Sequence, residues 1–394
     1  MAVTIGVPRE TFPGERRVAL IPRACDVLGK LGASIVVEQS AGVEAGFPDE
    51  QYALRGARSA SRRDVFQSEV ILQVRSLGAN PDAGRADLPL LRAGQTVIGF
   101  GEPLTALEQD SELARAGVTF FAMELMPRIT RAQSMDALSS MATIAGYRAV
   151  LLAATALPKI FPMLMTAAGT VTPARVLILG AGVAGLQAIA TARRLGAVVS
   201  AYDVRSAVKE QIESLGAKFV VLDIEAGGSE DKGGYAKAMG EEFYRRQREL
   251  LTNVIREQDV VISTAAVPGK KAPILITSEM ASALAPGSVI VDVAAERGGN
   301  CELTRPGETV IHQGVTILGP LNLASSAPYH ASQMYSSNIV SFLKLMLVKD
   351  GSLQLNREDE IIQETLVTYG REVVHARVNE LLGLIQAEGS GGAR

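Results

Sequence analysis

Short apolar runs alternate with stretches of helical spacing along the N-terminal third of the chain. Thr4–Val7 and Ser34–Glu38 have the length and composition of buried strands, and Cys25–Leu31 between them has helical spacing. Val70–Val74 and Thr96–Ile98 are further runs of strand length. This β-α-β rhythm predicts a parallel sheet with helices on both faces.

A second series of strands follows a long apolar segment. Residues 139–157 are rich in Ala, Leu, Met and Val without an interior Pro, which predicts a linker helix. The run Ala174–Leu179 is typical of a buried strand, and similar runs continue the series at Val198–Tyr202, Lys218–Leu222, Val260–Ser263, Val289–Val293 and Thr316–Leu318. The pattern therefore predicts two α/β domains, of which the second is the better-defined nucleotide-binding sheet.

A glycine-rich turn follows the first strand of the second series. Gly180–Gly185 matches G-x-G-x-x-G and opens a helical stretch, and Asp203 ends the next strand about 20 residues on. In this pattern Gly180 permits a tight turn, Gly182 leaves room for a pyrophosphate, and Gly185 lets helix and strand pack closely. The helix N-terminus presents N–H groups to phosphates. We therefore predict a dinucleotide site rather than glycines kept only for packing.

The residues around this turn bear on the choice of cofactor. Asp203 can accept hydrogen bonds from the adenosine ribose and repels a 2′-phosphate, which favours NAD(H), whereas Arg205 nearby can bind such a phosphate. We give the carboxylate more weight. Ala266 follows another strand of the same sheet and can line the cofactor, although an ordinary strand-to-turn connection explains it too.

A polar segment, residues 126–136, precedes the linker helix. It carries Arg128, Gln133 and Asp136 between apolar flanks, where the first domain is followed by the second. Gln133 can bind a carboxamide and Asp136 can pair with Arg128 over a cleft. The alternative, equally weighted, is a helix N-cap by Ser134 or Asp136 with the arginines in solvent.

Composition and charge exclude several classes of function. The chain has 394 residues and a formal net charge of −3, so neither a nucleic-acid nor a polybasic membrane surface is indicated. Two Cys give no disulfide framework and no metal-ligand spacing, which favours a cytoplasmic compartment. No uninterrupted apolar window reaches about 18 residues, so we expect no membrane span.

The distribution of histidines limits the chemistry. Residues 1–311 contain no His, so the usual general acid/base of a hydroxy-acid or amino-acid dehydrogenase is missing there. Hydride transfer between two nicotinamides needs no such group, only proximity, orientation and exclusion of water. A long segment between Leu222 and Asp259, with four Gly around Tyr235, is of a kind that is usually functional or disordered.

Several blocks of the sequence carry a resemblance to a known family. They are Val7–Leu20, Ala122–Asp136, Met165–Thr170, Gly180–Ala190, Gly233–Phe243 and Asp292–Asn300. The chain resembles the NAD(H)-binding alpha subunit of proton-translocating NAD(P) transhydrogenases, closely over about residues 1–320. The resemblance implies two Rossmann-like, doubly wound parallel-sheet domains with a cleft between them. The first would comprise residues 1–138 plus about 325–394, and the second residues 139–324.

The resemblance also implies roles for individual residues. Arg128, Gln133 and Asp136, with Ser139 beside them, would orient the nicotinamide, and Tyr235 would be the tip of a mobile loop that closes over the nucleotide. The remaining residues expected to bind NAD(H) are Ile129, Thr130, Ser134, Met135, Gly180, Gly182, Val183, Gly185, Asp203, Val204, Arg205, Gly234, Gln247 and Ala266. No metal is implied.

The family's reaction defines the expected partners. It passes a hydride from NADH to NADP⁺ held by a separate beta subunit, coupled to proton translocation through a membrane-spanning subunit. The resemblance thus implies a homodimer that is cytoplasmic and peripheral on the inner face of the cytoplasmic membrane through its partners.

Two other functions compete with this interpretation. Alanine dehydrogenase shares the N-terminal block and Arg17, but its catalytic Lys position is Arg75 here, its His is absent from Thr96–Glu102, and Glu296 replaces its Asp. A non-catalytic NAD-binding module would keep the glycines without needing Arg128, Gln133 or Tyr235.

One segment departs from the family pattern. Asn322–Pro328 lacks the Pro and Arg that usually follow the Asn, and Tyr329 and His330 come next. This puts the transfer of partner-facing residues in doubt there.

Overall fold

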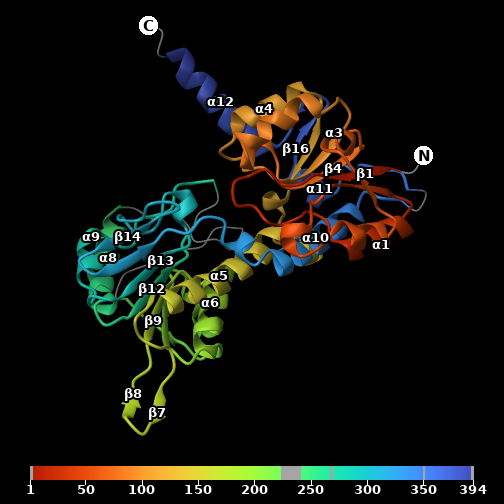
Figure 1. The fold of residues 1–394 in the computed structure, drawn as a ribbon. Coiled ribbons are helices and arrows are strands. Elements are labelled where there is room, and N and C mark those ends of the chain that lie inside the picture. Colours follow the sequence, from red (N-terminus) through yellow and green to blue (C-terminus); the bar gives the residue numbers. More distant parts are fainter. Residues whose placement is uncertain (1–2, 223–240, 267–268, 349–350, 392–394) are drawn as a thin grey trace. The chain divides into compact units, whose positions relative to one another are not determined.

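The computed structural model describes residues 3–222, 241–266, 269–348 and 351–391. It consists of two compact units, Met1–Met141 with Ser325–Arg394, and Ala142–Ala324 (Figure 1). We call them unit 1 and unit 2. Helix α5 (Ala137–Ala156) passes from unit 1 into unit 2.

The sheet of unit 1 has eight strands in the order β17-β16-β6-β5-β4-β1-β2-β3. They are β1 (Thr4–Val7), β2 (Ser34–Glu38), β3 (Arg58–Ala60), β4 (Val70–Arg75), β5 (Thr96–Phe100), β6 (Thr119–Ala122), β16 (Leu366–Tyr369) and β17 (Glu372–Val373). Strands β1 to β6 are parallel, whereas β16 pairs antiparallel with β6 and β17. The C-terminal segment thus extends the sheet made by the N-terminal residues.

The helices of unit 1 come from both ends of its sequence. They are α1 (Pro22–Lys30), α2 (Asp49–Ala53), α3 (Arg62–Val65), α4 (Leu107–Arg115), α10 (Pro328–Leu343), α11 (Glu360–Thr365) and α12 (Ala376–Gly391). Helix α10 packs on α1, and the hydroxyls of Ser332 and Ser336 accept the backbone N–H groups of Val18 and Ile21 at 3.0 and 3.1 Å. These buried hydrogen bonds fix the segment before α1.

The sheet of unit 2 has seven strands in the order β11-β10-β9-β12-β13-β15-β14. They are β9 (Arg175–Leu179), β10 (Val198–Tyr202), β11 (Lys218–Phe219), β12 (Val260–Ser263), β13 (Val289–Asp292), β14 (Thr309–His312) and β15 (Val315–Leu318), with helices α6 (Val183–Arg194), α7 (Lys209–Ser214), α8 (Glu241–Ile255) and α9 (Ser278–Ser282). Only the edge pair β14–β15 is antiparallel within it. The predicted α/β fold with two parallel-sheet domains is confirmed, with antiparallel edges that the pattern did not indicate.

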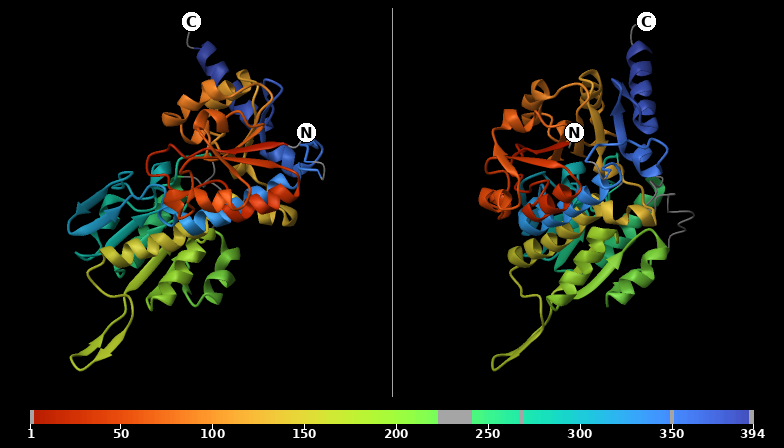
Figure 2. Two further views of the ribbon diagram at one scale, coloured as in Figure 1. Left: turned by 45° about the vertical axis from the view of Figure 1, so that its right-hand side comes forward. Right: turned by 90° about the vertical axis from the view of Figure 1, so that its right-hand side faces the viewer.

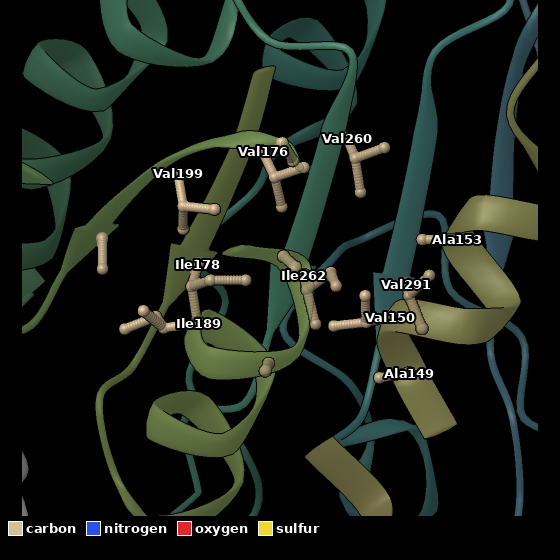
Figure 3. Close-up of a cluster of buried hydrophobic side chains, with 14 of the residues drawn as sticks. Ala149, Val150, Ala153, Val176, Ile178, Ile189, Val199, Val260, Ile262 and Val291 are labelled. Carbon is tan, nitrogen blue, oxygen red and sulfur yellow. The ribbon is translucent and has the colours of Figure 1, made fainter. Parts of the chain in front are cut away.

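Both faces of the unit 2 sheet are buried. On β9, Val176 and Ile178 pack on one face beside α5 and α6 (Figure 3). Leu177 and Leu179 belong to the core of the other face. Alternate residues of one strand therefore supply two cores, each fully buried aliphatic side chain contributing about 1.5–3 kcal/mol. This explains why the strand is a continuous apolar run in the sequence.

Helix α5 is the one described helix long and apolar enough to cross a membrane, with a mean hydropathy of 1.4. The same properties suit a core helix, and Ala149, Val150 and Ala153 are fully buried in the core of unit 2 (Figure 3). A hairpin formed by β7 (Leu164–Thr166) and β8 (Gly169–Val171) follows α5 and stands away from the rest of unit 2 (Figure 2).

Candidate nucleotide-binding site and polar loop

The turn after β9 is closed by its own glycines. Gly180 has φ +95°, and its N–H donates to the carbonyl of Tyr202 at 2.8 Å. A Cβ on Gly185 would lie 1.9 Å from the carbonyl oxygen of Gly180. Both positions therefore require glycine for the protein's own backbone, as the fingerprint predicts.

Gly182 differs from these two glycines. It is exposed, it is the N-cap of the 12-residue helix α6 without a side-chain hydrogen bond, and its added Cβ would meet no described atom within 4 Å. The protein itself does not need glycine here. Open space at a helix N-terminus, where the first N–H groups lack intrahelical partners, fits a pyrophosphate.

Asp203 lies directly after β10, beside this turn. Its Oδ2 accepts the Ala181 N–H at 2.7 Å, and its Oδ1 accepts the Arg205 N–H at 2.8 Å. The Arg205 guanidinium donates from Nε to Oδ1 and from Nη2 to Oδ2, both at 2.9 Å. Asp203, which favours NAD(H), and Arg205, which can bind the 2′-phosphate of NADP(H), are thus paired with each other.

The connection after β12 lies next to the turn, because β9 and β12 are parallel neighbours with Leu179 opposite Ser263. The Thr264 hydroxyl donates to the Gly180 carbonyl at 2.9 Å. Ala266, the predicted cofactor contact in this connection, is exposed.

Asn300 holds this connection in place. Its Oδ1 accepts the Ala265 N–H at 3.1 Å, and its Nδ2 donates to the carbonyls of Ala265 and Pro273, both at 2.8 Å. Its own N–H donates to the buried carboxylate of Asp292 at 2.7 Å. The sequence argument gave neither residue a role, although an acidic residue at a buried strand end was a signal.

The other predicted contacts in unit 2 are partly described. Gln247 of α8 is buried, and its Nε2 donates to the Tyr202 hydroxyl at 2.9 Å. Val204 packs against the core on the same side of the sheet, and Val183 is the first residue of α6. Gly234 and Tyr235 lie outside the described residues.

The polar segment 126–136, which we call the polar loop, belongs to unit 1. It contains a 3₁₀ turn (Thr130–Met135) between Ile129 and α5. Thr130, Gln133, Ser134 and Arg128 are exposed, Ile129 is half-buried, and Met135 is buried. The side chains proposed to contact a nicotinamide are thus presented on a loop whose apolar Met135 is anchored.

Asp136 is the capping residue at the start of α5. Its Oδ1 accepts the Ser139 N–H at 2.8 Å, and its Oδ2 accepts the Ser139 hydroxyl at 2.6 Å. The structure thus shows the capping arrangement that was one of the two interpretations. It also brings together Asp136 and Ser139, two of the predicted site residues.

Two contacts from the C-terminal segment hold the polar loop, and sequence reasoning missed both. The Arg131 guanidinium donates two hydrogen bonds to the Asp359 carboxylate, each 2.7 Å long. These bonds hold the pKa of Asp359 below its usual range. The Asn338 Nδ2 donates to the Ser134 carbonyl at 2.9 Å. Their sequence separations of 228 and 204 residues left no local signal.

Unit 1 has its own cluster of charges at the ends of β1 and β4. Glu15 accepts Arg17 Nε and Nη2 at 2.7 and 2.6 Å and Arg75 Nε at 3.3 Å. Glu10 accepts the N–H groups of Val74 and Arg75 at 2.6 and 3.1 Å. Burial and the neighbouring Glu15 raise the pKa of Glu10 to about 8.

Comparison with known proteins identifies the family. Residues 6–145 match the model "Alanine dehydrogenase/PNT, N-terminal domain", and residues 149–376 match "Alanine dehydrogenase/PNT, C-terminal domain". An NAD(P) transhydrogenase alpha-subunit chain of Rhodospirillum rubrum is 46% identical over 94% of this chain and 97% of its own length. The chain belongs to the family of NAD(P) transhydrogenase alpha subunits.

Solved structures agree with this family. A transhydrogenase from Sinorhizobium meliloti has a TM-score of 0.85 and 46% identity over 94% of this chain and 100% of that one. An L-alanine dehydrogenase has a TM-score of 0.79 and 26% identity over 97% and 99%. Membership of the transhydrogenase alpha-subunit family supports an oxidoreductase-type function and binding of NAD(H), and it confirms the resemblance found in the sequence.

The segment that departs from the family pattern has local constraints of its own. Asn322 has φ +51°, and its N–H donates to the Glu296 carboxylate. Tyr329 stacks on Phe47 with ring centroids 4.7 Å apart, and His330 meets the Tyr329 ring edge-on at 5.2 Å.

Proposed function

We propose that this chain is the NAD(H)-binding component of a proton-translocating transhydrogenase and that it takes part in Re/Si-specific hydride transfer from NADH to NADP⁺ on a partner subunit. The observation that carries the proposal is the open space at Gly182, at the N-terminus of α6 and beside the carboxylate of Asp203. Pyrophosphate and ribose need this combination.

Each predicted residue has a role in holding the nucleotide. When bound, NADH supplies the hydride. The α6 N-terminus beside Gly182 and Val183 would bind the pyrophosphate, Asp203 the adenosine ribose, and Val204, Gln247 and Ala266 would line the site. Gly180 and Gly185 shape the turn.

The polar loop would orient the nicotinamide. Arg128 and Gln133 would hold the carboxamide, with Ile129, Thr130, Ser134 and Met135 around it, and Asp136 and Ser139 would fix the end of the loop at α5. Because hydride moves directly between ring carbons, the chain needs no general acid or base, consistent with the absence of His from residues 1–311.

We further propose the partners that the reaction requires. They are an NADP(H)-binding beta subunit and a membrane-spanning subunit that couples the reaction to proton translocation, and they would hold the chain on the cytoplasmic face of the membrane. The relatives' designation as alpha subunits supports partners of this kind.

A second copy of the chain is also a proposed partner. The β7–β8 hairpin and its flank expose Met163, Leu164, Met165 and Val171, at 57%, 44%, 80% and 42%. Apolar side chains gathered on a projecting hairpin are typical of an association surface. Light scattering of the full chain should give the mass of a dimer, and Met165→Lys should shift it towards the monomer.

The first test of function measures the binding of NADH and NADPH and then hydride transfer with an added partner component. The full chain should bind NADH, seen by its fluorescence, more tightly than NADPH, and should transfer hydride only after an NADP(H)-binding transhydrogenase component is added. Turnover of pyruvate and ammonia by the chain alone would favour an alanine dehydrogenase and contradict the proposal. Binding of NADH without transfer to any such component would favour a non-catalytic module.

Gln133→Asn tests the role of the polar loop. We expect hydride transfer to slow by at least tenfold with little change in the Kd for NADH, because a shorter amide misplaces the carboxamide without removing the main contacts. Equal losses of both would mean that Gln133 only binds. Gln67→Asn, at an exposed glutamine of the same unit, is a matched control for the amide shortening.

A further inference from the structure

The carboxylate of Asp203 is fully engaged within the protein. Each carboxylate oxygen offers about two acceptor positions, and in this structure each one accepts two hydrogen bonds. Oδ1 takes Arg205 N–H and Nε, and Oδ2 takes Ala181 N–H and Arg205 Nη2, at 2.7 to 2.9 Å. The side chains of Asp203 and Arg205 are only 5% and 11% exposed. A ribose hydroxyl therefore finds no open acceptor position on this carboxylate.

The four donors fall into two kinds. The N–H groups of Ala181 and Arg205 are backbone groups of the glycine turn and of the strand end, and they stay in place whatever the side chains do. The other two belong to the Arg205 guanidinium, a side chain with several rotatable bonds. The backbone donors alone are sufficient to keep the carboxylate aimed at the site. The guanidinium can thus leave without moving Asp203.

We propose that Arg205 is a specificity-determining residue that occupies the ribose-binding position of Asp203, is displaced by the ribose hydroxyls of NADH, and attracts a 2′-phosphate whenever Asp203 does not hold it. The proposal deepens the proposed NAD(H) site and rests on it. The two hydroxyls replace the two guanidinium donors one for one, so the hydrogen-bond count of Asp203 is preserved. A 2′-phosphate cannot make this replacement, because it offers no donor to the carboxylate and repels its charge.

This arrangement lowers the affinity for each cofactor through a different partner of the ion pair. NADH must break a two-pronged ion pair before it binds, so Arg205 weakens NADH binding in the wild-type chain. The same ion pair keeps the guanidinium away from the phosphate of NADPH, so Asp203 excludes NADPH both directly and by holding Arg205. Removing Arg205 should therefore tighten the binding of NADH, and removing the charge of Asp203 should tighten the binding of NADPH.

The test measures Kd for NADH and NADPH by fluorescence with the full wild-type chain and three variants. Arg205→Gln should bind NADH severalfold more tightly than wild type. Asp203→Asn should bind NADPH at least tenfold more tightly than wild type, and the double variant Asp203→Asn/Arg205→Gln should lose that gain. Arg194→Gln, an exposed arginine at the far end of α6, controls for the change in overall charge.

The outcomes separate the inference from the proposed function. Weaker NADH binding by Arg205→Gln, or equal NADPH affinity of Asp203→Asn and the double variant, would overturn the role of Arg205. Wild-type chain that binds no NADH would instead refute the proposed site as a whole. If Asp203→Asn fails to fold, Arg205→Lys provides the second measurement, because a lysine cannot bridge both oxygens and should also tighten NADH binding.

Discussion

Five strands of each sheet follow the same order, and the two sheets differ in what lies at the point where that order reverses. In unit 2 the order around β9 and β12 is β11-β10-β9-β12-β13, and in unit 1 the order around β1 and β4 is β3-β2-β1-β4-β5. In open parallel sheets, ligands bind outside the carboxyl ends of strands at such a reversal. Both units therefore have a position suited to a ligand.

The connection after the first strand decides how that position is used. In unit 2 only Gly180–Gly182 separate β9 from α6, so a helix N-terminus lies at the strand end. In unit 1 the longer segment Pro8–Ile21 separates β1 from α1. Its Glu10 accepts backbone N–H groups at the end of β4, and its Glu15 binds the side chain of Arg75 there. At the reversal of strand order in unit 2, the space beside Gly182 is open. At the reversal in unit 1, the protein's own ion pairs fill the position. Strand order alone therefore does not make a nucleotide site.

The largest effect expected is that of Gly185→Ala. The added Cβ would lie 1.9 Å from the Gly180 carbonyl, so the backbone of the turn must shift, and we expect loss of NADH binding together with a clear fall in Tm. The control is Gly29→Ala in α1, where a Cβ meets no described atom within 4 Å and helix propensity is gained. NADH binding by Gly185→Ala equal to that of wild type would contradict the assignment of the turn.

The counterpart in unit 1 is Glu15→Ala. It leaves the buried guanidinium of Arg17 without its forked carboxylate, which should cost about 3–5 kcal/mol of unfolding free energy. The Kd for NADH should not change, because the residues proposed to bind the pyrophosphate and the adenosine ribose lie in unit 2. Denaturant unfolding and NADH titration measure the two effects. The control is Glu44→Ala. Glu44 forms an exposed ion pair with Arg16, so its loss should lower the unfolding free energy by under about 1 kcal/mol.

The glycine turn of unit 2 could be predicted from the sequence because its signals are local. The turn Gly180–Gly185, the strand before it and Asp203 fall within one β-α-β segment, and each has a direct physical reason for its residue type. Sequence reasoning predicted most of the buried strands for the same reason, but it missed β6 and β16. The short strands β3 and β17 are mostly exposed, so no apolar run marked them.

Contacts between distant segments could not be predicted. The fork between Arg131 and Asp359 joins residues 228 positions apart, and Asn300 reaches Ala265 from another connection of the sheet. The pairing of Arg205 with Asp203 could not be predicted either. The sequence pointed to both residues, but only the side-chain geometry shows that the guanidinium of Arg205 binds the carboxylate of Asp203. The glycine turn could be located from the sequence, but the residues that hold the surrounding loops could not.

Gly182→Ala separates the ligand's requirement from the protein's. Its Cβ would meet no described atom within 4 Å, so Tm should stay within about 1 °C of wild type, whereas NADH binding should weaken at least tenfold, or about 1.4 kcal/mol. The pair Gly182→Ala and Gly185→Ala thus distinguishes a glycine kept for the nucleotide from one kept for the fold. Unchanged NADH affinity in Gly182→Ala would mean that the open space is not the pyrophosphate position.

The smallest expected effect concerns a buried acid in unit 1. Both carboxylate oxygens of Asp110 in α4 lack a hydrogen-bond partner among the described residues, and burial followed by the charge of Glu124 raises the pKa of Asp110 to about 8. The unfolded chain releases this proton near pH 3.8, so the wild-type protein should lose stability as pH rises from about 4 to 8.

Asp110→Asn removes this titration and should be more stable than wild type at pH 8 by at least about 1 kcal/mol, with a smaller difference at pH 5, because each unit of pKa shift corresponds to about 1.4 kcal/mol. Glu108→Gln, an exposed residue on the same helix, should leave the pH profile unchanged. Denaturant unfolding across this pH range measures both. If the difference in unfolding free energy between Asp110→Asn and the wild-type protein does not grow with pH, Asp110 is not held protonated in the folded state. Because the residues proposed to bind the pyrophosphate and the adenosine ribose lie in unit 2, the Kd for NADH should be equal for both proteins at every pH. This extends the contrast between the two units from their loops to their electrostatics.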